Sequence, residues 1–265
     1  IAQAVRELKP PVGYRLWVCS ALGSVAETVT EIDLQAKENE RFSEPNVVVL
    51  QAQKRLASTK QLPLFGIPDA EFHTFVDRPG LLTKQEVRML SLGLLQLQPG
   101  AIVWDIGAGT GSISVEIARL VPSGKIYAIE RTAAGLALIR ENINRFEVSN
   151  LEAIAGSAPE ALESLPDPHR IVIGGGGAKK IVEILQTCTA RLRPGGVLVA
   201  HFATLETCTM ARSLLAQLGW AVQLLQVNLA RSSPLPTRVG TPATRFVPLN
   251  PVTLLQAVEP NGRIQ

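Results

Sequence analysis

Short apolar segments alternate with longer amphipathic ones through most of this chain, and this alternation restricts the fold more than any other feature. Five buried strands are predicted, at residues 101–105, 125–129, 151–155, 170–174 and 197–201. Strands that alternate with helices form a parallel sheet with helices on both faces. Two later apolar segments, 220–230 and 244–258, have no helical pattern between them and are predicted to form an antiparallel pair at one sheet edge. The expected fold is therefore α/β, with a mostly parallel sheet of seven strands.

The first 53 residues form a separate and smaller pattern. Residues 14–22 and 46–52 are predicted to be buried strands, and the polar stretch 28–41 between them is a candidate helix. Two strands cannot enclose a core, so residues 1–53 are interpreted as the end of another domain. Residues 54–64 are polar and are assigned to a linker, which leaves 65–265 as a complete domain.

Composition excludes several classes of protein. The chain is 46% hydrophobic and 18% charged, as expected of a globular protein, and its apolar stretches fall far short of the roughly 20 residues of a membrane span. No signal peptide is recognisable at its start. Three cysteines without CxxC spacing predict neither a disulfide framework nor a metal site, and they favour a reducing cytoplasm. Residues 207–258 contain no Asp or Glu, so this part is predicted to be locally positive.

A glycine-rich turn follows the strand predicted at 101–105. Positions 106–111 are Ile-Gly-Ala-Gly-Thr-Gly, and a helical pattern begins directly afterwards. Glycines here let the backbone turn sharply and approach a ligand beside a helix N-terminus. The dinucleotide pattern GxGxxG would require a glycine at 112, where the chain has Ser112. The spacing therefore favours S-adenosylmethionine over NAD; the alternative is a purely structural connection between strand and helix.

An acidic residue, Glu130, ends the next predicted strand, nineteen positions after Gly111. A carboxylate at this place can accept hydrogen bonds from both ribose hydroxyls of a nucleoside. The alternative is a solvated surface glutamate. After the strand at 151–155, the turn that contains Ala158 is expected to lie near the adenine and to contact it through its backbone.

Residues 83–86, Thr-Lys-Gln-Glu, match the capping box at a helix start. In this interpretation Thr83 is the N-cap and Glu86 is the N3 residue of a helix that runs to about residue 97. A cap also places a hydroxyl and free amides at a helix start that faces the cleft. A second role for Thr83 in ligand binding is therefore open.

Several segments together resemble one family. They are GIPDAEF at 66–72, RPGLLTKQEVRML at 78–90, WDIGAGTGSISVEIAR at 104–119, GSAPEAL at 156–162, GGGG at 174–177, TLET at 204–207 and NPV at 250–252. Through them, residues 65–258 resemble the decarboxylating precorrin methyltransferases of cobalamin biosynthesis, which act at carbon-15 of a precorrin or cobalt-precorrin. Residues 1–53 resemble the end of the tetrapyrrole methylase domain that methylates carbon-5. The resemblance implies a class I, Rossmann-like methyltransferase fold.

The resemblance also implies binding residues. Contacts to S-adenosylmethionine are expected at Thr83, Gly107, Ala108, Gly109, Thr110, Gly111, Glu130 and Ala158. Candidates for the carboxylates of an anionic tetrapyrrole are Arg78, Lys84, Arg88, His201 and Arg231, with Lys179, Lys180 and Arg238 as further ones. For each basic residue the alternative is a solvated surface charge. His201 stands where the family more often has asparagine or another small polar residue; it is either a proton carrier or a structural histidine.

The implied reaction joins methylation of a ring carbon to loss of an acetate group as carbon dioxide. The conjugated macrocycle accepts the electrons of the broken bond, and an electron-rich ring carbon attacks the sulfonium methyl. The protein then has only to align donor and acceptor and partly desolvate the departing carboxylate. No covalent nucleophile and no catalytic side chain is assigned. A homo-oligomer is expected, and a tetramer is one candidate.

Two other functions stay open. An RNA or protein methyltransferase would share the fold, but residues 173–177 read Ile-Gly-Gly-Gly-Gly where base-amine methyltransferases commonly have Asn or Asp, two prolines and an aromatic residue. Aromatic content is 5%, with no basic tract between aromatic residues, so neither nucleic acid nor membrane is an expected partner. The other function is a non-catalytic scaffold that binds the cofactor without turnover.

Overall fold

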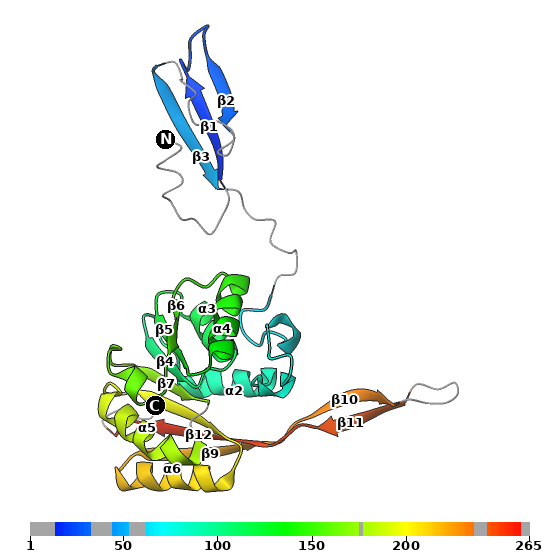
Figure 1. The fold of residues 1–265 in the computed structure, drawn as a ribbon, viewed down its shortest axis with the longest axis vertical. Coiled ribbons are helices and arrows are strands. Elements are labelled where there is room, and N and C mark those ends of the chain that lie inside the picture. The colour runs from blue at the N-terminus through cyan, green and yellow to red at the C-terminus, as the bar shows by residue number, and fades with distance from the viewer. Residues whose placement is uncertain (1–13, 33–43, 53–61, 175–176, 236–242, 261–265) are drawn as a thin grey trace. The chain divides into compact units, whose positions relative to one another are not determined.

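The structure is a computed structural model that describes residues 14–32, 44–52, 62–174, 177–235 and 243–260 (Figure 1). The chain divides into two compact units, Ile1–Leu62 and Pro63–Gln265.

The described part of the first unit contains three antiparallel strands in the order β2-β1-β3: β1 (Tyr14–Ser20), β2 (Thr28–Ile32) and β3 (Asn46–Ala52). Leu16, Val18 and Ser20 are buried, as period-two alternation predicts for one sheet face. The prediction of a helix at 28–41 is wrong for residues 28–32, because these residues form β2, which pairs with β1 along its whole length. The segment Thr-Val-Thr-Glu-Ile is rich in β-branched residues, which fit a pleated surface. Residues 33–41 lie outside the described part.

A seven-stranded sheet forms the centre of the second unit. Its order is β6-β5-β4-β7-β8-β12-β9, and β12 runs antiparallel to both of its neighbours while the other pairs are parallel. The strands are β4 (Ile102–Ile106), β5 (Lys125–Glu130), β6 (Leu151–Ala155), β7 (Arg170–Ile173), β8 (Val197–Phe202), β9 (Ala221–Val227) and β12 (Val252–Val258). The predicted mostly parallel sheet with an antiparallel edge is confirmed.

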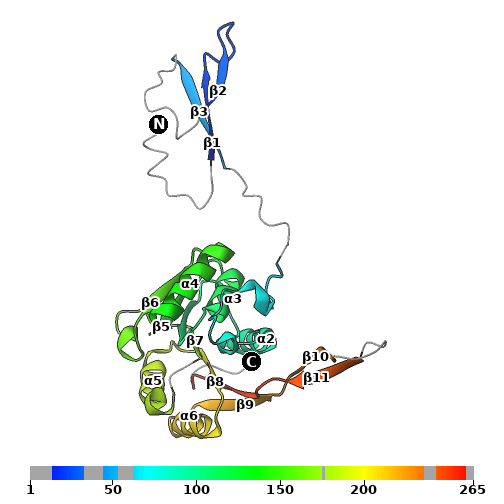
Figure 2. The ribbon, with the colours of Figure 1, turned by 45° about the vertical axis from the view of Figure 1, so that its right-hand side comes forward.

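Helices cover both faces of this sheet (Figure 2). Val103 packs with the helices α2 (Gln85–Leu95), α3 (Ser112–Leu120) and α4 (Ala133–Phe146), whereas its neighbour Trp104 packs with α5 (Gly177–Arg191) and α6 (Leu205–Gln217). Successive side chains of a strand point to opposite faces, so β4 contributes to both layers of the core. Among the described helices, none combines the length and the apolar character that a membrane crossing requires.

An antiparallel hairpin, called the arm here, extends away from the sheet between β9 and β12 (Figure 1). It consists of β10 (Ala230–Leu235) and β11 (Ala243–Pro248). The predicted edge pair therefore needs a correction: β9 and β12 pair in the sheet, but residues 244–248 belong to the arm. Pro251 lies between β11 and β12, where a residue without an N–H donor fits the break in the strand.

The strap, defined as residues 66–82, precedes α2. It contains two single-turn 3-10 helices, Asp69–Glu71 and Pro79–Leu81. Ile67, Phe72 and Leu82 are buried and belong to the same core cluster as α2 and α3. The strap is thus packed into the core of the second unit.

Candidate cofactor and substrate site

A cavity of about 660 Å³ lies at the carboxyl ends of the central strands. The strap lines the cavity through Phe75, Arg78 and Leu81, and α5 lines it through Lys180 and Ile184. The turns at the strand ends line it through Gly107, Gly109, Glu130, Arg131, Thr132, Gly156, Ser157, Ala158 and Gly174. In parallel α/β sheets, this edge is where ligands bind. Of the predicted cofactor contacts, the structure thus brings Gly107, Gly109, Glu130 and Ala158 together around one cavity.

The glycine turn holds left-handed backbone at three positions: φ is 72° at Gly107, 59° at Gly109 and 74° at Gly111. A Cβ on Gly109 would meet no atom within 4 Å, whereas one on Gly111 would lie 3.1 Å from Ile139 of α4. Gly109 therefore faces open space at the cavity, and Gly111 lets the turn pack on α4. Thr110 is only 2% exposed and does not line the cavity.

The Glu130 carboxylate is oriented by three internal hydrogen bonds. Its Oε2 accepts from the Gly109 backbone N–H at 3.1 Å, and its Oε1 accepts from the N–H and the hydroxyl of Thr132, each at 2.8 Å. The Thr132 hydroxyl also accepts from Gly135 N and so caps α4. A carboxylate has about four acceptor sites, and Glu130 lines the cavity. It is placed to receive hydroxyl groups of a ligand bound against the glycine turn.

Asp105, directly before the turn, was not singled out from the sequence. It is 2% exposed, and the Ser114 hydroxyl donates to its Oδ2 at 2.5 Å. Burial raises the pKa of Asp105 to about 6, and the nearby charge of Glu130 acts in the same direction. The sequence feature that could have indicated this buried carboxyl group is an acidic residue inside the otherwise apolar strand β4.

The capping box is absent from the start of α2. Lys84 is the N-cap residue, without a side-chain hydrogen bond, and α2 begins at Gln85. The Glu86 carboxylate binds Arg231 of the arm instead, with Oε1 at 2.9 Å from Nε and Oε2 at 2.5 Å from Nη2, which lowers the pKa of Glu86. This bidentate pair of two ions gives Glu86 two charge-assisted hydrogen bonds, where the capping box would give it one bond to a backbone N–H. Neither Thr83 nor Lys84 lines the cavity.

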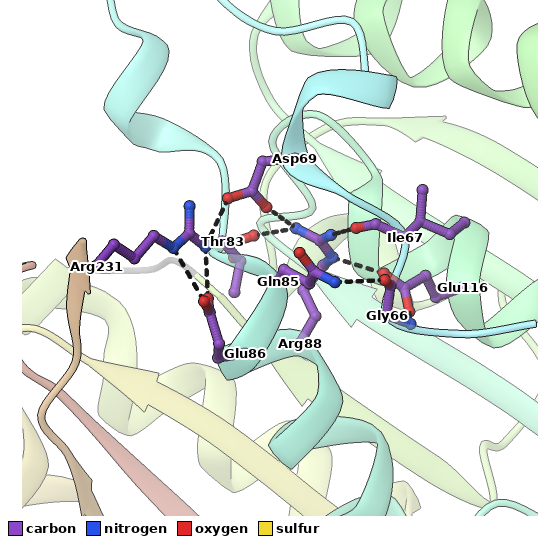
Figure 3. Close-up of polar contacts among 9 residues, drawn as sticks. All are labelled: Gly66, Ile67, Asp69, Thr83, Gln85, Glu86, Arg88, Glu116 and Arg231. Carbon is purple, nitrogen blue, oxygen red and sulfur yellow. Dashed lines mark hydrogen bonds and ion pairs between the residues drawn. The ribbon is translucent and has the colours of Figure 1, made fainter. Parts of the chain in front are cut away.

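Arg88 is the centre of a buried polar network (Figure 3). Its side chain has no exposed surface; Nε donates to Glu116 at 2.8 Å, Nη1 to Asp69 at 2.8 Å, and Nη2 to the Ile67 carbonyl. Asp69 also accepts from Arg231 Nη2 at 3.0 Å. These contacts correct the assignment of Arg88 to a substrate, because its buried guanidinium is committed to protein oxygens. Arg231 does not line the cavity, but its side chain is 41% exposed, so a contact from Arg231 to the substrate stays a prediction.

His201 is likewise held by the protein. Its Nε2 lies 2.8 Å from the Ser91 hydroxyl, which donates to the Val87 carbonyl at 2.7 Å, so the imidazole is the donor of this pair. Burial lowers the pKa of His201 to about 4. The ring is therefore neutral near pH 7 and does not line the cavity. Of the two interpretations of His201, the structure favours the structural histidine.

Among the described residues, three cationic side chains line the cavity: Arg78, Arg131 and Lys180. Arg78 stacks over the Phe75 ring at 5.0 Å and pairs with Asp77 at 3.0 Å. Arg131 was not a sequence candidate, although its place next to Glu130 at a strand end points to the cavity. Arg238 and the side chain of Lys179 lie outside the described part of the chain.

Comparisons with known proteins agree with this geometry. Residues 74–259 match a family model described as precorrin methyltransferase domain. A probable cobalt-precorrin-6B C(15)-methyltransferase (decarboxylating) of Pyrobaculum aerophilum is 37% identical over 194 residues, which cover 72% of this chain and 95% of that protein. A precorrin-6Y C(5,15)-methyltransferase [decarboxylating] of Sinorhizobium is 34% identical over 241 residues, or 90% of this chain; the chain spans 55% of that protein.

A solved structure is similar as well. The crystal structure of a precorrin-6y C5,15-methyltransferase from Geobacter metallireducens superposes with a TM-score of 0.68 at 39% sequence identity. The match covers 74% of this chain and 99% of that one.

Proposed function

The chain belongs to the precorrin methyltransferase family, since the family model matches residues 74–259, and from this premise we propose that it methylates carbon-15 of a precorrin or cobalt-precorrin. S-adenosylmethionine is the methyl donor, and an acetate side chain leaves as carbon dioxide, as a step of cobalamin biosynthesis. The observation that carries this proposal is the cavity at the carboxyl ends of the strands, where Glu130 and the open side of Gly109 lie next to each other.

The residues that line the cavity suit S-adenosylmethionine. Glu130 receives the ribose hydroxyls, and the turn beside Ala158 lies along the adenine. Gly107 and Gly109 line the cavity, and open space at Gly109 lets the backbone approach the ligand. When bound, the sulfonium supplies an activated methyl group. Ala108, Thr110 and Gly111 shape the turn, and a contact from Thr83 stays a prediction.

The substrate side of the cavity is proposed at its cations. Peripheral carboxylates of the tetrapyrrole pair with Arg78, whose guanidinium is held over Phe75, and with Lys180, whose exposed ammonium also contacts Glu160 at 3.2 Å. The residues hold the macrocycle so that the ring carbon faces the methyl group in line, and this orientation lowers the barrier to methyl transfer. The bond between the acetate methylene and its carboxyl carbon breaks, and its electron pair enters the conjugated ring.

The first unit is proposed to be the C-terminal part of a domain that methylates carbon-5. The 241 residues matched to the Sinorhizobium protein exceed the length of Pro63–Gln265, so this similarity reaches into the first unit. The linker predicted at 54–64 stays a prediction, because residues 53–61 lie outside the described part of the chain. This chain contributes only the strands β1 to β3 of the first one in its described part.

A homo-oligomer, with a tetramer as one candidate, is part of the proposal. The arm is a two-stranded hairpin, which is at best marginally stable by itself, and it exposes Phe246 to 76% and Leu235 to 38%. Burial of these side chains against a second copy would stabilise the arm.

All three cysteines are free thiols, which fits the proposed cytoplasmic location.

Mass spectrometry of the product tests this function. The chain is incubated with S-adenosylmethionine and a precursor already methylated at carbon-5. The proposal expects the product to gain one methyl group and to lose one carbon dioxide. A precursor recovered unchanged, while the protein binds S-adenosylmethionine, would favour the non-catalytic scaffold.

A further inference from the structure

The strap forms one wall of the cavity, and the glycine turn forms another. Phe75, Arg78 and Leu81 of the strap line the cavity together with Gly107 and Gly109. The distance between these walls sets the space for cofactor and substrate. A side chain that ties the strap to the turn would therefore control the geometry of the site.

Asn142 makes this connection from α4. It has no exposed surface; its Oδ1 accepts from the His73 backbone N–H at 2.8 Å, and its Nδ2 donates to the carbonyls of His73 at 3.1 Å and Thr110 at 2.9 Å. The orientation of the amide follows from its partners, since one N–H faces the oxygen and two carbonyls face the nitrogen. One side chain thus satisfies both backbone polar groups of a strap residue and one of the glycine turn.

We infer that Asn142 is a positioning residue for the cofactor site, which rests on the proposed binding of S-adenosylmethionine. His73 lies two residues before Phe75, and Thr110 directly follows Gly109, so both partners adjoin residues that line the cavity. Without the Asn142 amide, the backbone N–H and the two carbonyls that it binds would be buried and unsatisfied. These groups would then move to find water or other hydrogen-bond partners. Movement of either partner changes the cavity.

Other contacts hold the strap but do not include the glycine turn. Phe72 packs on Phe146 with ring centroids 4.8 Å apart, and Glu71 pairs with Arg145 at 2.9 Å. Arg88 binds Asp69 and the Ile67 carbonyl at the start of the strap (Figure 3). With these contacts in place, loss of the Asn142 amide leaves the strap attached and alters its register against the turn.

Asn150 offers a matched control in the same domain. Its Nδ2 also donates to two backbone carbonyls, those of Ala118 at 3.1 Å and Val121 at 2.9 Å, at the end of α3 and away from the cavity. In Asn142→Asp and in Asn150→Asp the shape of the side chain is kept, but a carboxylate oxygen replaces the donor and faces two carbonyls. Both variants are therefore expected to lower the melting temperature.

The experiment measures the dissociation constant of S-adenosylmethionine by calorimetry and the melting temperature of each full-length variant. N142D is expected to weaken binding by about tenfold or more, while N150D stays within about twofold of wild type. Wild-type affinity in folded N142D, or equal weakening in N150D, would overturn the inference. If N142D does not fold, N142S, which removes the amide without adding charge, has to show the same selective loss. A wild-type chain that binds no S-adenosylmethionine would instead refute the proposed function.

Discussion

Glu86 in the first turn of α2 and Arg231 on the arm form a bidentate ion pair, with Nε–Oε1 at 2.9 Å and Nη2–Oε2 at 2.5 Å. The two residues are 145 positions apart in the sequence, and Asp69 of the strap binds the same guanidinium. This contact joins the arm to the strap and to the helix that carries Arg88. It explains why a match to a helix-capping motif did not become a helix cap.

Glu86→Gln is expected to lower the free energy of unfolding by about 1 kcal/mol in low salt. The pair is bidentate, but its side chains are 38% and 41% exposed, so solvent screening keeps the effect small. Glu152→Gln is the control, because Glu152 makes a single contact of 3.1 Å to Lys125 at similar exposure. Denaturant titration checks both variants, and equal losses would mean that the bidentate geometry adds nothing.

Gly109→Ala is expected to weaken S-adenosylmethionine binding, whereas Gly195→Ala leaves it unchanged. Both glycines have positive φ, 59° and 73°, and in both an added Cβ meets no atom within 4 Å. Backbone strain should therefore cost a similar ~1 kcal/mol of stability in each variant. Only Gly109 borders the cavity. Calorimetry separates the two effects, and undiminished binding by G109A would show that the ligand lies elsewhere.

Glu130→Ala is expected to weaken cofactor binding by at least about tenfold, since each hydrogen bond from a ribose hydroxyl to the carboxylate contributes ~1.5–3 kcal/mol. The variant also frees the N–H groups of Gly109 and Thr132. Glu163→Gln, an exposed glutamate that does not line the cavity, is the control. A folded E130A protein that binds as tightly as wild type would contradict the assignment of Glu130.

His201 is expected to make the protein sensitive to acid. Its pKa is about 4 in the folded chain and 6.5 in the reference state, so the unfolded chain binds the proton first. The free energy of unfolding is therefore at its full value above pH 6.5, where His201 is neutral in both states. It falls by up to about 3 kcal/mol as the pH decreases towards 4. His201→Asn should flatten the curve of unfolding free energy against pH in this window, and an unchanged slope would refute the prediction.

The sheet and the strand-end residues were predictable because their causes are local. Buried strands contain short apolar runs, such as residues 171–173 of β7, and parallel strands bring their carboxyl ends to one edge. Gly109 and Glu130 therefore meet although 21 positions separate them. The start of β2 was not predictable in this way, since pairing with β1 decides its conformation.

The protein partners of the basic residues were not predictable from the sequence, for a physical reason. Arginine is mostly exposed in proteins, and nothing near Arg88 in sequence indicates that Glu116, 28 residues later, buries it. Arg231 is likewise bound by partners 145 and 162 residues away. Asn142 shows the same limit: its partner His73 is 69 positions away, so a local pattern cannot reveal the contact.

Carbon-13 NMR of the product tests the central claim most directly. The chain is incubated with S-adenosylmethionine labelled in its methyl group and with a precursor that is unmethylated at carbon-5 and carbon-15. The account predicts a single labelled methyl group, bonded to carbon-15, in a product that has lost one acetate carboxyl group as carbon dioxide. A labelled methyl group on carbon-5, or two labelled methyl groups, would contradict it.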